Sequence, residues 1–326
     1  MNSFGNKFRI SLFGESHGIL IGVTVDGVPA GIPLVDSDFE ADLARRRSGA
    51  KGTTPRKEED IPELVSGVCD GYTTGAPLTI VFRNNNTRSG DYSSFREIPR
   101  PGHADYTAAV KYNSFNDIRG GGHFSGRITL CLVAAGTVAK KILKGITIEA
   151  HISELGGIPE CQGKDNGGWD RVLQDAISAG DSIGGVITCT CTGVPAGLGD
   201  PFFESLESKI AHLIFSIPGT RGVEFGDGFR ASAMRGSRHN DPITDKDGHT
   251  SSNGAGGING GISNGNPIVF RTAIKPTSSI SCEQRSFNFR TGEMENFSVK
   301  GRHDACIALR CPVIIEAAAA IALADC

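Results

Sequence analysis

The chain has 326 residues, of which 38% are apolar and 21% are charged, and its net charge is -3. This composition provides material for a core and excludes global disorder, while the charge excludes a general electrostatic footprint for nucleic acid or a membrane surface. Glycine is the outlier at 44 residues, nearly twice the usual share of about 7%. Because the glycines follow no period, they exclude collagen and predict glycine-shaped loops.

The first 35 residues predict strands. Apolar and polar residues alternate at 8–12, and an apolar run at 19–25 leads into a turn signal, Asp26-Gly27. A helix is predicted next, from about residue 38 to residue 47, because Ser37-Asp38-Phe39-Glu40 has the spacing of a capping box.

The rest of the chain alternates strand and helix patterns. The predicted strands are 78–82, 146–152, 185–194 and 267–274, and the predicted helices are 104–115, 127–143, 169–179, 203–215 and 314–324. The sequence shows no repeat at a fixed period, and no convincing linker divides it into domains. The sequence therefore predicts a single α+β domain over residues 1–326, built of layered sheets and helices.

The cysteines and the termini indicate the compartment. Nine cysteines are an odd number and form no Cys-x-x-Cys pair, so neither a disulfide framework nor a metal site is predicted. The first residues lack the apolar stretch of a signal peptide, and the longest apolar tract, Pro312–Ala324, is short and contains Glu316. One tryptophan and four tyrosines are too few for a platform that stacks single-stranded nucleic acid. We therefore expect a cytoplasmic protein that binds neither nucleic acid nor membranes.

Two short turns present histidines. In Gly14-Glu15-Ser16-His17-Gly18 the flanking glycines allow a tight turn that projects Ser16 and His17 beyond a strand end. In residues 100–105 a Pro-Gly turn presents His103 at the start of a helix, where the helix dipole favours bound anions. The alternatives are a turn with an exposed histidine and a helix-capping turn.

Three further segments combine glycine with polar groups. Three glycines at 120–122 can expose several N–H groups to one ligand, although no Walker A motif follows them, and a hinge is the alternative. A cation and three hydroxyls at 275–279 follow the Asn/Gly-rich segment 253–262, and these groups suit a phosphate monoester. The alternative for the segment is a surface loop without a ligand. Residues 301–304 supply a guanidinium, an imidazole and a carboxylate that could bind a ligand. The alternative is a cluster of salt bridges on the surface.

These segments share a capacity to bind anions in a slightly acidic protein. If the fold gathers them, they form a cationic pocket for small ligands that carry phosphates and carboxylates. The members of this predicted pocket are Arg46, Arg100, Arg127, Lys275, Arg302, His17, His103 and His123.

The same segments resemble the chorismate synthase family. The motifs that carry the resemblance occur in the family's order over nearly the whole chain, at 13–18, 25–31, 45–47, 100–105, 119–122, 222–226, 275–279 and 301–304. The resemblance implies a β-α-β sandwich, commonly assembled as a homotetramer with one FMN site per subunit. It also implies the anti-1,4-elimination of phosphate from 5-enolpyruvylshikimate 3-phosphate to give chorismate.

The family requires reduced FMN although the reaction has no net redox change, and NADPH is a candidate reductant. The substrate carries two carboxylates and a phosphate, which matches the arginines of the motifs. The departing phosphate leaves an electron-poor allylic centre, which a reduced flavin can stabilise, and flavin N5 is the implied base for the ring proton.

The resemblance also implies roles for individual residues. His17 protonates or stabilises charge near the flavin, His103 assists near the leaving phosphate, and Ser16 and Asp304 form a proton relay for N5. The implied FMN-binding residues are His123, Phe124, Ser125, Arg238, His239, Gly260, Lys275, Pro276, Thr277, Ser278, Ser279 and Arg302. The implied contacts to anionic ligands are Arg46, Arg100 and Arg127.

The chain departs from the family's commonest pattern in three places. His123-Phe124 stands where Arg-Ser is common, and Arg238-His239 stands where Gln-Ala is common, so backbone contacts are expected there. Lys51 lies near the place of a second arginine.

Two other functions stay open. An NAD(P)H-dependent flavin reductase would use the FMN site without the substrate arginines or the Ser16 and Asp304 pair. A non-catalytic polyanion-binding module would need only the basic residues and the glycine loops.

Overall fold

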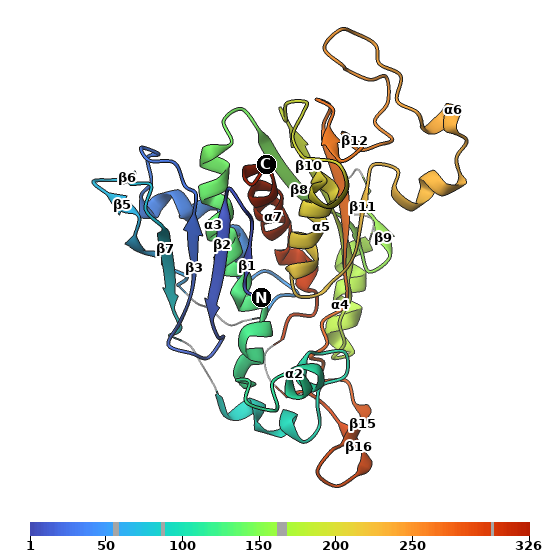
Figure 1. Ribbon diagram of the computed structural model, residues 1–326. Coiled ribbons are helices and arrows are strands. Elements are labelled where there is room, and N and C mark those ends of the chain that lie inside the picture. Colours follow the sequence, from blue (N-terminus) through green and yellow to red (C-terminus); the bar gives the residue numbers. More distant parts are fainter. Residues whose placement is uncertain (55–58, 86–88, 162–167, 301–302) are drawn as a thin grey trace.

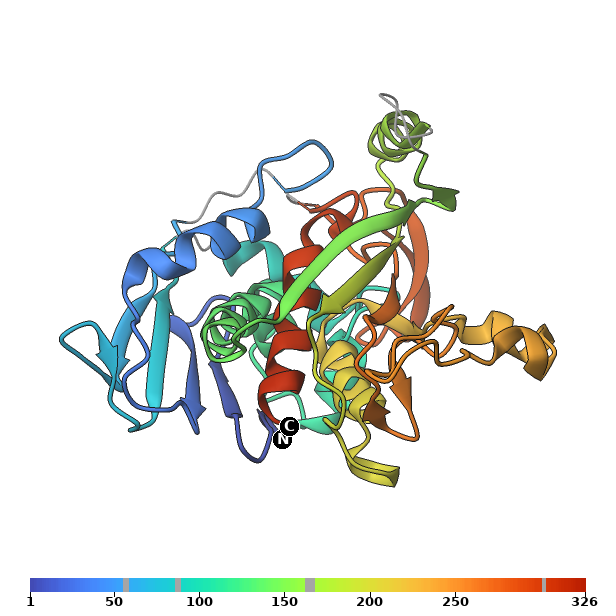
Figure 2. The ribbon, with the colours of Figure 1, turned by 90° about the horizontal axis from the view of Figure 1, so that it is seen from above.

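The computed structural model describes residues 1–54, 59–85, 89–161, 168–300 and 303–326. Two antiparallel five-stranded sheets enclose a layer of helices (Figures 1 and 2). The first sheet has the strand order β1 (Ser3–Phe4), β2 (Arg9–Gly14), β3 (Leu20–Asp26), β7 (Leu78–Arg83) and β4 (Glu63–Ser66). The second has the order β11 (Thr220–Phe225), β14 (Ile268–Ile274), β10 (Gly185–Thr192), β8 (Thr147–Leu155) and β9 (Ile158–Pro159).

Two central helices, α3 (Thr129–Ile142) and α7 (Pro312–Ala324), pack side by side between the sheets (Figure 2). Their close approach depends on small residues: a Cβ at Gly136 would lie 2.3 Å from the Cβ of Ala317. Helices α1 (Glu40–Arg46) and α5 (Leu206–Ser216) flank the pair. This arrangement confirms the predicted α+β fold and β-α-β sandwich.

The remaining helices and hairpins lie around the two sheets. They are α2 (Asp105–Lys111), α4 (Trp169–Ser178), α6 (Gly236–His239), β5 (Val68–Cys69) with β6 (Tyr72–Thr73), β12 (Ile258–Asn259) with β13 (Ile262–Ser263), and β15 (Gln284–Asn288) with β16 (Glu293–Phe297). In the part of the chain that is described, no helix has the length and apolar character needed to cross a membrane. The extent of the chain as one domain stays a prediction.

One buried carboxylate fixes α1 against the central helices. Glu316, on the otherwise apolar α7, accepts two hydrogen bonds from Arg45 at 2.7 and 2.6 Å. It also accepts one from Lys140 at 3.2 Å and one from the Ala150 N–H at 2.9 Å.

Every predicted helix and strand is present, with differences at the ends. The predicted position of the capping box is wrong by two residues. The cap is at Val35, whose N–H donates to the Asp38 carboxylate at 2.8 Å, and a 3₁₀ turn, Asp36–Phe39, precedes α1. Helix α2 ends four residues before the prediction, because Asn113 and Ser114 have φ of 49° and 61°, which no helix accommodates. The strands β4, β9 and β11 and the hairpins β5–β6, β12–β13 and β15–β16 were not predicted, since they are short or their apolar and polar residues do not alternate clearly.

Candidate active site

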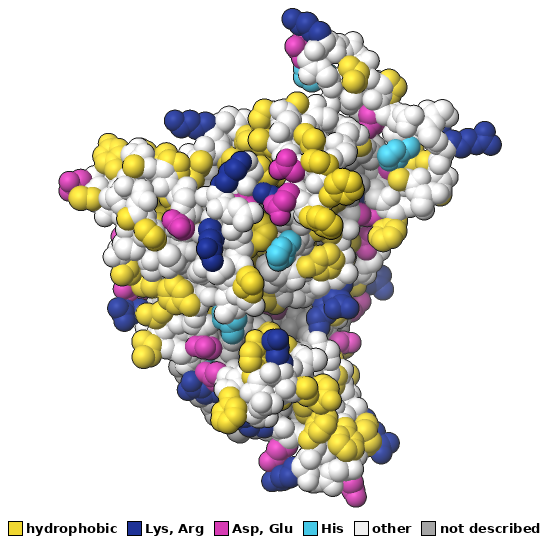
Figure 3. Space-filling model, viewed as in Figure 1, with side chains coloured by type: hydrophobic (Ala, Val, Ile, Leu, Met, Phe, Trp, Pro, Cys, Tyr) yellow, Lys and Arg dark blue, Asp and Glu magenta, His cyan; other side chains and the backbone are white. Residues whose placement is uncertain are grey.

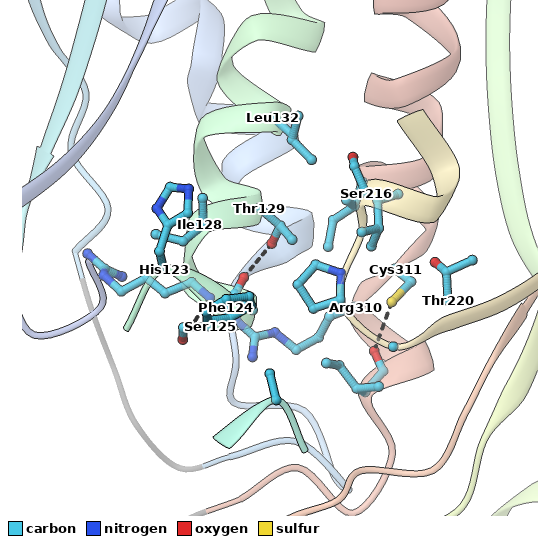
Figure 4. Close-up of a pocket in the computed structure, with 18 of the residues that line it drawn as sticks. His123, Phe124, Ser125, Ile128, Thr129, Leu132, Ser216, Thr220, Arg310 and Cys311 are labelled. Carbon is cyan, nitrogen blue, oxygen red and sulfur yellow. Dashed lines mark hydrogen bonds between the residues drawn. The ribbon is translucent and has the colours of Figure 1, made fainter. Parts of the chain in front are cut away.

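A cavity of about 940 Å³ opens where α3 and α7 begin. Figure 4 shows Ile128, Thr129 and Leu132 of the α3 region on one side and Ser216, Thr220 and Cys311 on the other, with Arg310 between them. In Figure 3 the surface is hollowed between the upper helices and the lower loops, with histidine and basic side chains nearby. Helix N-termini favour anions, and the volume is at the upper end of the range for small-molecule sites, roughly 300–1,000 Å³.

A turn of three glycines forms one wall of the cavity. Gly120, Gly121 and Gly122 have φ of 62°, 82° and 55°, a left-handed conformation that other residues rarely adopt. A Cβ at Gly120 would lie 2.5 Å from the His17 ring and 2.8 Å from Ser16 Oγ. The glycine therefore lets the turn that carries Ser16 and His17 pack directly against it, and the Ser16 N–H donates to the Gly122 carbonyl at 3.1 Å.

His103 belongs to a buried network with Arg100 and Asp105. Arg100 donates to Asp105 from Nε at 2.8 Å and from Nη2 at 2.9 Å, while its Nη1 donates to Ser279 Oγ at 3.0 Å. His103 Nδ1 lies 2.7 Å from Asp105 Oδ1. Burial alone would raise the pKa of Asp105, but the hydrogen bonds from Arg100 and His103 outweigh it and hold that pKa well below its usual range.

The loop 275–279 packs against the turn that precedes His103. Lys275 Nζ donates to the Gly102 carbonyl and to Ser278 Oγ, and Ser278 Oγ donates to the same carbonyl at 2.8 Å. Burial, and to a lesser degree the charge of Arg221, lower the pKa of Lys275. An anion bound beside Nζ would raise the pKa of Lys275 again, because an opposite charge favours the charged form.

A second basic cluster lies at the start of α3. Arg46 donates to Thr129 Oγ1 at 3.1 Å and to the Gly126 carbonyl at 2.9 Å, and its Nη1 is 3.7 Å from Asp60. Arg127 binds the same Asp60 at 2.9 Å.

Arg310 extends this cluster. It donates to the Arg46 carbonyl at 2.9 Å and to Asp304 at 3.4 Å. Burial, followed by the charge of Arg310, lowers the pKa of Arg46 to about 9. Three guanidinium groups thus share two carboxylates, which leaves an excess of positive charge beside the cavity.

Several buried polar atoms at or near the cavity have no hydrogen-bond partner in the described chain. They are Ser16 Oγ, Thr220 Oγ1, Thr277 Oγ1 and His303 Nε2. Burial lowers the pKa of His303, so its neutral form is favoured. Because buried polar groups are normally satisfied, these atoms mark places where a ligand or water can bind.

Most of the predicted site residues line this cavity. They are His17, His103, His123, Phe124, Ser125, Arg46, Arg100, Arg127, Lys275, Pro276, Thr277, Ser278, Ser279 and Asp304. His123 is held in place by its Nδ1, which lies 2.8 Å from the Gly14 carbonyl.

Four predicted residues are not brought to the cavity within one chain. Ser16 lies behind Gly120, and Gly260 forms the turn of the β12–β13 hairpin. Arg238 and His239 belong to α6, which projects from the second sheet (Figure 1). Contact of Gly260, Arg238 and His239 with FMN therefore stays a prediction.

Three further predictions need comment. Arg302 lies outside the described residues. Lys51 does not line the cavity, and its Nζ is 3.9 Å from Asp170. The predicted relay is not formed as a direct hydrogen bond, because Asp304 accepts from the Thr54 N–H at 2.8 Å and from Arg310, not from Ser16.

The sequence analysis missed several lining residues. Arg310 and Lys300 add basic groups, and Tyr92 stacks edge-on against His17 with ring centroids 5.2 Å apart. His303, the imidazole of the predicted 301–304 segment, also lines the cavity although it was given no role. A signal existed for Arg310, which is the last charged residue before an apolar helix and so lies at the positive end of that helix. Tyr92 offered none, because most of its neighbours in sequence are polar and it belongs to a short 3₁₀ helix, Ser89–Arg96.

Comparison with known proteins agrees on one family. The model of the family "Chorismate synthase" matches residues 8–326. A chorismate synthase of Chitinophaga pinensis is 60% identical over 326 residues, covering 100% of this chain and 96% of the relative. One of Dehalococcoides mccartyi is 44% identical over 348 residues, covering 99% of this chain and 96% of that protein.

A solved structure, described as a crystal structure of chorismate synthase, has a TM-score of 0.75 and 28% sequence identity to this chain. The match covers 99% of this chain and 92% of that one. The fold, the order of the motifs and the full-length identity thus agree, and the chain belongs to the chorismate synthase family of lyases.

Proposed function

We propose that this cavity catalyses the anti-1,4-elimination of phosphate from 5-enolpyruvylshikimate 3-phosphate, giving chorismate, with reduced FMN bound. The observation that carries the proposal is the gathering of His17, His103 and His303 with two basic clusters around one cavity of about 940 Å³. A substrate with two carboxylates and a phosphate needs such a surplus of positive charge.

The described residues fit FMN. Lys275 supplies a cation next to the hydroxyl of Ser278, and Thr277 Oγ1 is buried without a partner in the described chain. These groups would hold the flavin phosphate, while Ser125 and its neighbours would line the ring. When bound, reduced FMN supplies an electron-rich ring that stabilises the electron-poor allylic centre left by the departing phosphate.

The histidines would donate protons or stabilise charge. His103 would donate a proton from Nε2 to the phosphate as its C–O bond breaks, and His17 would stabilise charge near the flavin. Arg46 and Arg127 have most of their donors occupied by Asp60, Thr129 and backbone carbonyls, so they would act mainly through their charge.

Asp304 would act as a proton acceptor. It lines the cavity, whereas Ser16 supports the His17 turn from behind Gly120. A relay between Ser16 and Asp304 would need a bridging ligand or water.

The resemblance also supports a cytoplasmic homotetramer. Phe202, Phe203 and Phe229 have exposed fractions of 85%, 92% and 85%. Large exposed apolar side chains of this kind are common where subunits meet.

The test is turnover by the purified chain under anaerobic conditions. We expect phosphate and chorismate to appear with 5-enolpyruvylshikimate 3-phosphate and reduced FMN, and neither with oxidised FMN. His17→Ala and His103→Ala should each lower turnover by about 10–10⁴-fold. Oxidation of NADPH by FMN and the chain, without consumption of the substrate, would instead favour the flavin reductase. Substrate binding without turnover would favour the polyanion-binding module.

A further inference from the structure

The pair His103 and Asp105 determines which imidazole nitrogen faces the cavity. Nδ1 lies 2.7 Å from Asp105 Oδ1 and 3.1 Å from Arg100 Nη2. Nε2 makes no hydrogen bond within the described chain, and a Cβ at Gly121 would lie 3.6 Å from it. The ring is therefore held at one nitrogen and open at the other.

Geometry selects one tautomer for the neutral ring. If Nδ1 carried no proton, its lone pair would face the lone pairs of a carboxylate oxygen at 2.7 Å, which is repulsive. If Nδ1 carries the proton, it donates to Asp105, and Arg100 Nη2 still has an acceptor in Asp105 Oδ1 at 2.9 Å. The Nδ1–H tautomer is thus the favoured one, and Nε2 then carries a lone pair towards the cavity.

We propose that Asp105 is a positioning residue that holds His103 in the Nδ1–H form and so reserves Nε2 for the leaving phosphate. This inference rests on the function proposed above. In the step, the C–O bond breaks, its electron pair leaves with the phosphate, and a phosphate oxygen takes the proton from Nε2 of the charged ring. The ring left behind is the neutral Nδ1–H form that Asp105 stabilises, and solvent restores the second proton.

Arg100 makes this arrangement durable. It occupies Asp105 with two N–H groups and a backbone N–H, so the carboxylate stays charged and cannot rotate. The guanidinium itself lies over the Phe95 ring, 4.4 Å from its centroid, with a side-chain exposure of 4%. The rigid, neutral ion pair offers His103 one acceptor in a fixed place.

Asp105→Asn is expected to switch the tautomer. The amide oxygen would take the place of Oδ2, where it accepts from both the Arg100 N–H and Nε, because this orientation sets the amide nitrogen against one donor, Arg100 Nη2, and the opposite one sets it against two. The amide nitrogen would then face His103 Nδ1, which must accept, and the proton would move to Nε2.

The test is ¹⁵N NMR of the histidine ring nitrogens in the full chain, with His103 assigned by its loss in His103→Gln. We expect the Nδ1–H signature in the native protein and the Nε2–H signature in Asp105→Asn. The matched control is Asp245→Asn, since His249 Nδ1 lies 2.7 Å from Asp245 in an exposed pair away from the cavity. This control should leave both the His103 spectrum and turnover unchanged.

Turnover provides the second readout. Asp105→Asn should lower kcat by about 10²–10⁴-fold, the range for a lost acid–base group, with a smaller change in KM. A neutral His103 ring that carries its proton on Nε2 and none on Nδ1 in the native protein would overturn the proposal without any variant, even if Asp105→Asn failed to fold. An unchanged kcat in a folded Asp105→Asn variant would also overturn it. A native chain that shows Nδ1–H but never releases phosphate would contradict the proposed function and leave the tautomer assignment standing.

Discussion

The cavity has two basic regions, which differ in whether buried arginines are matched by an equal number of carboxylates. Around His103, Arg100 is matched by one carboxylate, Asp105, through two side-chain hydrogen bonds. At the start of α3, the guanidinium groups of Arg46 and Arg127 share Asp60.

This difference separates two tasks. A neutral ion pair fixes the orientation of an imidazole without adding net charge, which suits a group that transfers protons. A cluster with excess positive charge is costly to bury, and an anionic ligand offsets that cost. We therefore expect proton transfer to depend on the first region and the attraction of the anionic substrate to depend on the second, while the flavin phosphate is held by the 275–279 loop beside the first.

The largest expected effect is a loss of stability when the shared carboxylate of the second region is neutralised. Asp60 has φ of 52°, which asparagine tolerates well, so Asp60→Asn removes the charge without backbone strain. Arg46 and Arg127 then lose their shared counter-ion, and the loss of one partner from a buried ion pair costs about 3–5 kcal/mol. Urea denaturation should show this loss in the free energy of unfolding.

The control for that variant is an exposed ion pair of good geometry. Arg83 donates to Glu63 at 2.8 and 3.2 Å, and such surface pairs contribute about 0.2–1 kcal/mol. Glu63→Gln should therefore be much milder. Equal losses in the two variants would contradict the view that Asp60 compensates buried charge.

The fold was largely readable from the sequence because several strands alternate with a period of 2 residues and the central helices α3 and α7 are long runs of apolar residues. The turn signals at 14–18 and 120–122 also identified segments that meet at the site. The partners of the arginines were not readable, because neither Asp60 nor Thr129 shares a local motif with Arg46, and the packing of α1 on α3 brings Arg46 to Thr129. The excess of charge at one region and its balance at the other are tertiary properties.

The glycine turn joins the two regions and provides the next comparison. An alanine at 120 or at 121 adopts a left-handed backbone, at about 1–2 kcal/mol. At 120 its Cβ also meets the His17 ring at 2.5 Å, which adds about 1–3 kcal/mol of overpacking. At 121 the nearest atoms are 3.6 Å away.

Gly120→Ala should therefore unfold at lower urea than Gly121→Ala and should lose more turnover, because the His17 turn is displaced. The two variants are matched in backbone strain, so their difference isolates the contact with His17. Identical behaviour would mean that the glycines serve only the backbone conformation.

Lys275 tests where the flavin phosphate binds. If it binds in the 275–279 loop, Lys275→Ala should weaken FMN binding by about 1–3 kcal/mol, the scale of a lost charge-assisted hydrogen bond. Fluorescence titration of FMN measures this. Ser286→Ala, in the hairpin β15–β16 and not on the cavity, is the control and should bind FMN as the native chain does. An unchanged affinity in Lys275→Ala would assign the phosphate to the cluster around Arg46.

The smallest expected effect concerns the pKa of His303. Burial lowers this pKa most. The charges of Arg100 and His103 lower it further, and the charge of Asp304 raises it. Because the folded state holds the pKa of His303 below its usual value of 6.5, the unfolded chain binds more protons as the pH falls below about 6.5. Stability should therefore decrease on acidification through this window, whereas carboxylates such as Asp105 lose their contribution only at much lower pH. His303→Gln, which cannot titrate, should show a flatter dependence of unfolding free energy between about pH 7.5 and 5.5. The same slope in both proteins would mean that His303 binds protons equally in the folded and unfolded states, and would contradict the lowered pKa.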